Sequence, residues 1–294
     1  MKIKITKWAV AYRKKTGHFL DTSIDFKKIK DSRRVFYADP FLFDYKGNTF
    51  LFVEDYDNKL GRGVISYSKF NKEKGLFDGF KEIIREDFHL SYPLVFEYEN
   101  EIFLMPEANE SNSLYIYKAK KFPSEWEKCD ILINDIKLVD TTPFKYNGEL
   151  FAISKRNENP DAPMLLLKID SENWKVIEKR NITDDVSISR PGGNVFEFNN
   201  QYYMVTQDCK DDYGKALNLM SFTIDDNMDL KYHMEKRITP DMVKVTGIKE
   251  IKGIHTYNFS KELEVIDFKY PIISFNRLFW KSINLVKKKL CKKI

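Results

Sequence analysis

Short apolar runs alternate with turn residues along most of the chain. The runs FLF and TFLFV, at residues 41–43 and 49–53, lie on either side of KGN, and the same arrangement recurs around the turns EN, NG and NN. Asn and Gly tolerate the positive φ that tight β-hairpins require. The pattern therefore predicts a series of β-hairpins.

The hairpins recur about every 50 residues, which is the spacing of an internal repeat. Each repeat has a polar residue, a short apolar strand, a turn and a second apolar strand that ends at a polar residue. A further pair of strands, such as GRGVISYSKF, brings each repeat to four strands. Four repeats carry a marker proline, and a weaker fifth reads GIHTYNFSKELEVIDFK; the prolines are Pro40, Pro93, Pro143 and Pro191.

Four-stranded antiparallel sheets that repeat in this way stack as blades around a central channel, because one such sheet cannot cover both of its faces. We therefore predict an all-β protein, a five-bladed β-propeller with four-stranded antiparallel blades, over residues 1–272. An open β-sandwich with chance similarity between its hairpins is the alternative. The 15% aromatic content suits either β architecture.

The last residues, 273–294, have a different pattern. From Phe275 the apolar residues recur at spacings of three and four, and lysines occupy the positions between them. This predicts a basic amphipathic helix after the propeller. Such a helix suits the surface of an anionic membrane, through residues 275–294. A helix that caps the open edge of the propeller is the equal alternative.

Charge and cysteine content narrow the classes of partner. The net charge is only +5, and a good part of the excess lies in the last twenty residues, so no nucleic-acid partner is expected. Three widely spaced cysteines indicate neither a disulfide framework nor a zinc site. With no secretory leader and no apolar run of transmembrane length, we expect a cytoplasmic protein, held peripherally at the inner membrane face if the tail binds lipid.

Polar residues recur at equivalent places in the repeats. The innermost strand of each blade borders the channel, so equivalent residues should meet around one axis. One set lies just before the marker prolines, and a second ends the second strands. Any one residue of the second set could face solvent, and recurrence in register makes that alternative less favoured. The first set is Asp39, Tyr92, Thr142 and Arg190, with His255 or Thr256 in the fifth repeat, and the second is Glu54, Glu107, Lys155 and Gln207, with its neighbour Asp208.

These side chains favour a sugar as the ligand. Sugar hydroxyls need several hydrogen-bonding partners, and the apolar faces of sugars stack on rings such as Tyr92. No metal and no other cofactor is predicted, because histidines are few, although carboxylates can hold a divalent cation. His255 has two interpretations, a hydrogen-bonded structural histidine or a ligand at the axis.

The chain contains five motifs in a specific order: YADPF, SYPLVFEYENEIFLMPEA, VDTTPF, SRPGGNVF and GIHTY. In this order they resemble the N-terminal propeller domain of plant glucosamine inositolphosphorylceramide transferase and its bacterial stand-alone relatives. The similarity spans about residues 35–258. More distantly, the chain resembles the furanosidase-type propellers that include the family-43 glycoside hydrolases. Those enzymes use an Asp of the first blade as base, a second Asp to tune and orient, and a Glu as acid.

The distant resemblance implies that Asp39 is the base and Asp140 the second aspartate. The sequence departs from that pattern at Arg190, which stands where the acid is sought. Glu107 or Glu54 would have to replace the acid, because glycoside hydrolysis needs two carboxyl groups. Simple hydrolysis is therefore disfavoured.

An Arg that faces an Asp suits a phosphate-bearing substrate. We therefore predict a glycosyltransferase of cell-surface glycan or glycolipid synthesis, with a nucleotide-sugar donor in the central pocket. In this hypothesis Asp39, Asp140 and Glu107 are the catalytic candidates. The alternatives are a furanosidase-like glycoside hydrolase and a non-catalytic module that binds a glycan.

Overall fold

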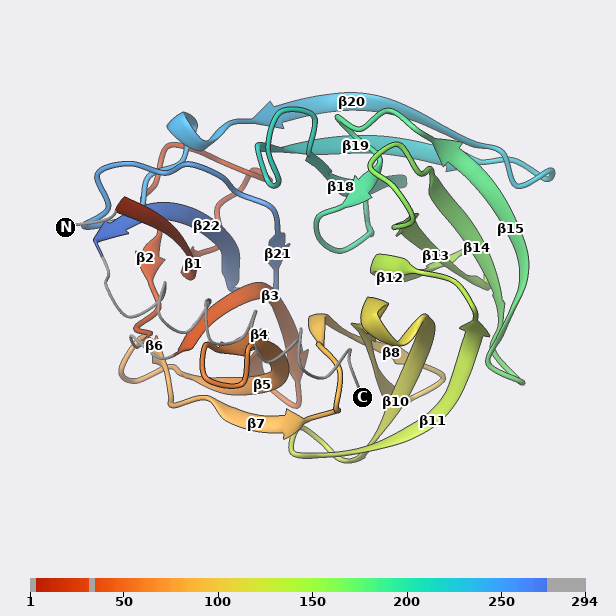
Figure 1. Cartoon of the computed structure of the whole chain (residues 1–294), viewed down its shortest axis with the longest axis horizontal. Coiled ribbons are helices and arrows are strands. Elements are labelled where there is room, and N and C mark those ends of the chain that lie inside the picture. Colours follow the sequence, from red (N-terminus) through yellow and green to blue (C-terminus); the bar gives the residue numbers. More distant parts are fainter. Residues whose placement is uncertain (1–3, 32–34, 274–294) are drawn as a thin grey trace, which may run out of the picture.

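The computed structural model describes residues 4–31 and 35–273. Within these residues the strands form five antiparallel sheets arranged around a central axis (Figure 1). The strands β7, β11, β15 and β20 lie at the rim, and β3, β8, β12 and β21 lie toward the centre. The predicted five-bladed β-propeller with four-stranded blades is thereby confirmed.

The first two blades follow the predicted order, with a hairpin nearest the axis and further strands outside it. Blade one consists of β3 (Val35–Tyr45), β4 (Asn48–Asp57) and β5 (Arg62–Asn71), with β6 (Leu76–Phe77) and β7 (Lys81–Ile84) both on β5. Blade two consists of β8 (Ser91–Tyr98), β9 (Glu101–Glu107), β10 (Ser113–Lys121) and β11 (Glu125–Asn134).

The third and fourth blades repeat this order. Blade three consists of β12 (Leu138–Tyr146), β13 (Glu149–Arg156), β14 (Met164–Asp170) and β15 (Lys175–Thr183). In blade four the inner strand is divided into β16 (Arg190–Pro191) and β17 (Phe196–Phe198), followed by β18 (Gln201–Asp208), β19 (Ala216–Ile224) and β20 (Leu230–Ile238).

The fifth blade differs from the prediction, because its outer strands come from the start of the described chain. The hairpin of β21 (Tyr257–Phe259) and β22 (Leu263–Ile273) is completed by β1 (Lys4–Lys14) and β2 (Lys27–Lys28). Strand β1 pairs with β22 in an unbroken ladder from Lys4 opposite Ile273 to Lys14 opposite Leu263. Pairing between distant segments closes the circle and leaves no open edge between the first and last repeats.

The tight turns of four hairpins have the geometry that their residues favour. Both central residues have positive φ at Lys46 and Gly47, Glu99 and Asn100, Asn147 and Gly148, and Asn199 and Asn200. Positive φ at two successive positions is the type I′ arrangement, whose twist matches that of the strands.

The blades pack against one another through apolar side chains such as Phe52, Leu104 and Leu167, each fully buried. Burial of one such side chain contributes about 1.5–3 kcal/mol.

The predicted helix at residues 273–294 lies outside the described residues, except for Ile273, which ends β22. Its contact with a membrane stays a prediction. None of the helices that the described residues form is long and apolar enough to cross a bilayer.

Candidate functional site

Three inner strands contain a β-bulge at the same place, and each bulge presents one residue in a left-handed conformation. The bulges interrupt the pairing of β3 with β4, β8 with β9 and β12 with β13. The residues concerned are Asp39 (φ 48°), Tyr92 (φ 47°) and Asp140 (φ 53°). A positive φ is costly for a residue other than Gly, and bulges of this kind often lie beside functional sites.

The equivalence of these bulges corrects the predicted register of the third repeat. Lys155 pairs with Val139, as Glu107 pairs with Ser91. The residue equivalent to Asp39 is therefore Asp140, and not Thr142. Pro143 comes two residues too late to serve as the marker that Pro40 and Pro93 provide, so the sequence spacing misled the alignment.

Asp140 is the centre of one hydrogen-bonded cluster. Its Oδ2 accepts a bond of 2.5 Å from Arg190 Nε and one of 2.7 Å from Gln207 Nε2. Its backbone N–H lies 3.4 Å from Glu107 Oε2, and that carboxylate is 3.7 Å from an Arg190 terminal nitrogen. The second distance exceeds that of a hydrogen bond. Blades two, three and four thus contribute one charged group each to the cluster.

A second cluster surrounds Asp39 and joins blade one to blade five. Asp39 Oδ1 accepts a hydrogen bond from the Thr256 hydroxyl, and its backbone N–H donates to Asp267 Oδ2 at 3.0 Å. His255 Nδ1 lies 2.6 Å from the same Asp267 oxygen and 3.7 Å from Asp39 Oδ1. The His255 ring is therefore oriented by Asp267, in the manner of a carboxylate and imidazole pair.

Aromatic side chains border the two clusters. The Trp8 indole stacks on the His255 ring at 4.0 Å, and Tyr213 meets the same ring edge-on at 4.9 Å. The Arg190 guanidinium lies 4.9 Å from the centre of the Tyr213 ring. Tyr213 thus contacts one residue of each cluster, His255 and Arg190, which joins the two clusters into one site, and Tyr213 itself is 38% exposed. We call this the central site; it comprises Asp39, Glu107, Asp140, Arg190, Gln207, His255 and Asp267.

Sequence reasoning missed Asp267, Trp8 and Tyr213. Asp267 follows the segment LEVI within the second strand of the fifth repeat, as Glu54 follows FLFV in the first repeat. Its place in the repeat could therefore have identified it. Trp8 carried no comparable signal, because it lies on β1 and reaches the site only through closure of the fifth blade.

Burial sets the charge state of the carboxyl groups. Burial raises the pKa of Asp39 to about 6. The His255 charge opposes this rise, and the charges of Asp140 and Asp267 add to it. Burial and the neighbouring Asp140 raise the pKa of Glu107 well above its usual range, although Arg190 opposes them. The pKa of Glu54 is also raised, first by burial and then by Asp39 and Glu107. Shifted pKa values of this kind are common among general acids and bases.

The Tyr92 side chain bridges from blade two to blades three and four at the centre of the propeller. The side chain is fully buried, and its hydroxyl accepts a bond of 2.9 Å from the Gly193 backbone N–H. The same hydroxyl lies 2.9 Å from Thr142 Oγ1. Phe41 and Leu94 pack on it in a small apolar cluster. We call these three side chains the channel plug, and their packing gives Tyr92 a structural role.

Other predicted residues lie in separate contacts. Lys155 Nζ donates to the Ala162 carbonyl at 2.7 Å and to Ser189 Oγ at 2.9 Å. Asp208 pairs with Arg237 within blade four. Glu54 Oε1 lies 3.5 Å from His89 Nε2, at the border of the central site. Of the predicted site residues, the structure brings together Asp39, Glu107, Asp140, Arg190, Gln207 and His255.

Ligand atoms of Asp39, His255 and Asp267 lie within 4.8 Å of one another, a spacing compatible with a metal ion. The donor set argues against one. Asp267 Oδ1 accepts hydrogen bonds from the backbone N–H groups of His255 and Thr256, and Oδ2 faces Asp39 N and His255 Nδ1. Both oxygens are therefore occupied by protein donors, which a cation would have to displace.

The raised pKa of Asp39 predicts a dependence of stability on pH. The folded protein keeps a proton that the unfolded chain releases near pH 4, so the free energy of unfolding falls as the pH rises from about 4 to about 6. We expect Asp39→Asn to reduce this loss by roughly 2–3 kcal/mol. Urea unfolding at pH 4.5 and pH 7 measures the difference. Asp211→Asn, at a carboxyl that is 71% exposed, is the control, and an equal pH dependence in both variants would contradict the prediction.

Solved structures with a similar fold come from enzymes that act on glycosidic bonds. α-L-Arabinofuranosidase from Lactobacillus brevis aligns with a TM-score of 0.59 and 13% identity, over 77% of this chain and 79% of that one. The catalytic domain of the Coprinopsis cinerea GH62 α-L-arabinofuranosidase aligns with a TM-score of 0.59 and 12% identity, over 82% and 93%. At such identities the likeness shows the fold alone.

Sequence comparison finds closer relatives in plants. Glucosamine inositolphosphorylceramide transferase 1 of Oryza sativa subsp. indica is 34% identical over 192 residues, covering 63% of this chain and 26% of that protein. The protein of the same name from Arabidopsis thaliana is 30% identical over 197 residues, covering 64% and 26%. The matched part is thus about a quarter of each relative. Residues 25–261 match the family described as glucosamine inositolphosphorylceramide transferase 1, N-terminal, and the chain belongs to that family.

Proposed function

We propose that this protein is a carbohydrate-active enzyme of glycan or glycolipid biosynthesis, which transfers a sugar from a nucleotide-sugar donor at the central site. One observation carries the proposal: a buried Asp39, with a pKa of about 6, lies in one site with the ion pair of Arg190 and Asp140. A group that takes up a proton and a group that binds an anion are therefore close together.

In this mechanism Asp39 is the general base. As the acceptor oxygen bonds to the anomeric carbon, its proton passes to the Asp39 carboxylate. The bond from that carbon to the diphosphate oxygen breaks, and the electron pair leaves with the diphosphate. A base is most effective when its pKa lies near the working pH, and a value of about 6 is closer to neutrality than that of an ordinary aspartate.

Arg190 is the candidate for the diphosphate. Asp140 occupies Nε, whereas the terminal nitrogen near Glu107 is not in hydrogen-bond range of that carboxylate. The Arg190 side chain is 17% exposed, so a phosphate oxygen has access to it from the surface near Tyr213. Guanidinium groups bind such oxygens in pairs of hydrogen bonds.

The names of the plant relatives support the broader part of the proposal. They describe transferases of glucosamine to inositolphosphorylceramide, which is a glycolipid reaction. Because this chain matches about a quarter of those proteins, the donor, the acceptor and the reaction itself are our proposals for it.

A glycoside hydrolase is the second candidate. Burial holds the pKa of Glu107 high, as a general acid requires, and Asp39 contributes to that shift, so the two carboxyls are close enough to interact. Hydrolysis uses such a pair, one protonated and one ionised. In that reaction Arg190 would hold Asp140 in place and would contact no substrate phosphate.

Isothermal titration with nucleotide sugars and with neutral oligosaccharides separates these functions. We expect micromolar binding of a nucleotide sugar, lost in Arg190→Lys, and loss of transfer but retained binding in Asp39→Asn. Arg190→Lys keeps the charge but not the paired donors, and circular dichroism checks its folding. Binding of neutral oligosaccharides alone, unaffected in Arg190→Lys, would refute transfer. Such binding would favour a hydrolase if turnover requires Asp39. It would favour a glycan-binding module if no turnover occurs.

A further inference from the structure

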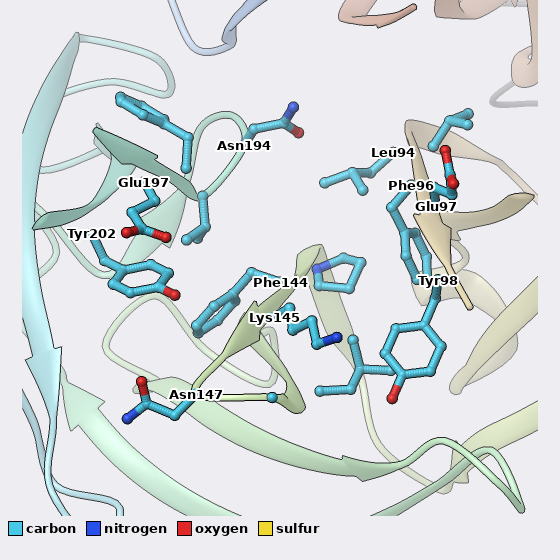
Figure 2. A pocket seen from close by; sticks show the side chains of 16 residues that line it. Leu94, Phe96, Glu97, Tyr98, Phe144, Lys145, Asn147, Asn194, Glu197 and Tyr202 are labelled. Carbon is cyan, nitrogen blue, oxygen red and sulfur yellow. The ribbon is translucent and has the colours of Figure 1, made fainter. Parts of the chain in front are cut away.

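A pocket lies where the inner strands reach their hairpin turns, at the far end of β8, β12 and β17 from the central site. Its volume is about 490 Å³. This is within the range of small-molecule sites. Figure 2 shows Glu197 and Tyr202 on one side, Phe96 and Tyr98 on the other, and Lys145 extending between them. We call it the end pocket.

The channel plug separates the end pocket from the central site. Tyr92 and Tyr98 are six residues apart on β8, which corresponds to roughly 20 Å along an extended strand. Leu94, which is 2% exposed, packs with Tyr92 in the plug and also lines the end pocket. A ligand in the end pocket is therefore shut off from the chemistry at Asp39.

The walls of the end pocket combine apolar and aromatic surface with polar groups. Phe96 and Phe144 supply aromatic surface, and Leu94, Pro143 and Val195 add aliphatic surface. The Lys145 ammonium lies 5.8 Å from the centre of the Tyr98 ring. Aromatic faces beside hydrogen-bonding groups match a pyranose, which has apolar C–H faces and a rim of hydroxyls.

The polar groups of the end pocket indicate the charge of the ligand. One carboxylate, Glu197, and one ammonium, Lys145, face it, together with the amide of Asn147, whereas the Glu97 side chain lies on the other face of β8 from Phe96 and Tyr98 (Figure 2). The two charges balance, so the pocket offers an anionic ligand no net positive charge.

We propose that the end pocket binds a pyranose unit that is neutral or carries an amine, as an accessory saccharide site distinct from the central site. The pyranose lies between Phe96 of β8 and Phe144 of β12 (Figure 2). Its hydroxyls or amine donate to the Glu197 carboxylate, and Lys145 donates to a ring or hydroxyl oxygen. This proposal goes beyond the proposed transferase and does not depend on which reaction the central site performs.

Saturation-transfer NMR and calorimetry with glucose, glucosamine and glucuronic acid test the proposal. We expect binding of glucose and glucosamine but not of glucuronic acid. Lys145 and Glu197 are exposed, so Lys145→Met and Glu197→Ala should fold normally. Each variant should weaken sugar binding at least about tenfold, because each loses a hydrogen bond to a charged group. Glu125→Ala, at an exposed carboxylate of the outer strand β11, is the matched control.

The end-pocket variants distinguish this site from the central site. Sugar binding that is lost in Lys145→Met and Glu197→Ala but kept in Glu125→Ala supports the end pocket, even if no transfer is ever observed. Binding that is kept in Lys145→Met and Glu197→Ala would place the sugar outside the end pocket and overturn the proposal. The absence of binding by all three sugars to the folded protein would also overturn it.

Discussion

Replacing Arg13 by Met is expected to lower the free energy of unfolding by about 3–5 kcal/mol. Arg13 lies on β1, is 5% exposed, and its Nε donates to Glu264 Oε2 of β22 at 2.6 Å. Its two terminal nitrogens donate to the carbonyls of Ile24 and Asp21, each at 2.6 Å. The substitution leaves the fully buried Glu264 without its counter-charge at the closure of the propeller.

Guanidinium unfolding followed by circular dichroism measures this loss. Arg85→Met is the matched control, because the ion pair of Arg85 with Glu82 is exposed and is expected to contribute about 0–1 kcal/mol. The double variant Arg13→Met/Glu264→Gln should recover part of the stability, since no unpaired charge stays buried. Equal losses in Arg13→Met and Arg85→Met would show that the closure does not depend on this pair.

Replacing Arg190 by Ala is expected to have a similarly large effect at neutral pH, about 3–5 kcal/mol. Asp140 is 2% exposed and would lose its closest cationic partner, while Glu107 would lose the charge that opposes the rise of its pKa. The folded variant would therefore hold protons more tightly than the unfolded chain. Its stability should fall as the pH rises above the ordinary carboxyl pKa, and the loss should be smaller at pH 5 than at pH 7.5.

Unfolding curves at the two pH values test this dependence. Arg156→Ala, whose ion pair with Glu158 is exposed, is the control and should change the stability by about 0–1 kcal/mol at either pH. The double variant Arg190→Ala/Asp140→Asn should be less destabilised than Arg190→Ala at pH 7.5. A loss in Arg190→Ala that is the same at both pH values would mean that the carboxyl groups are not coupled to the guanidinium.

The propeller could be predicted because each repeat contains its own local signals. The turns at Asn147 and Gly148 and at Asn199 and Asn200 favour positive φ, and alternating apolar residues define the strands on either side. Such preferences act over a few residues and survive in any context. The family resemblance rested on the order of several such segments, and it is confirmed over residues 25–261.

The position of individual site residues was harder to predict. Proline spacing aligned Thr142 with Asp39, whereas the bulges place Asp140 there. Tyr92 occupies the equivalent place in blade two, but its hydroxyl bonds to Gly193 and its ring packs with Phe41 and Leu94. A bulge and a buried hydroxyl depend on contacts across strands, which a single repeat does not contain.

The strand class, the hairpins, the number of repeats and the family could be predicted from the sequence, because all of these depend on short-range patterns repeated along the chain. Three features became visible in the folded protein alone: β1 completes the fifth blade, Trp8 stacks on His255, and Asp267 holds the His255 imidazole. The contacts of β1 and of Trp8 join segments more than two hundred residues apart, and His255 and Asp267 lie on different segments of the fifth blade. Their partners are selected by closure of the ring and by the need to satisfy buried polar groups, and neither is local to the sequence.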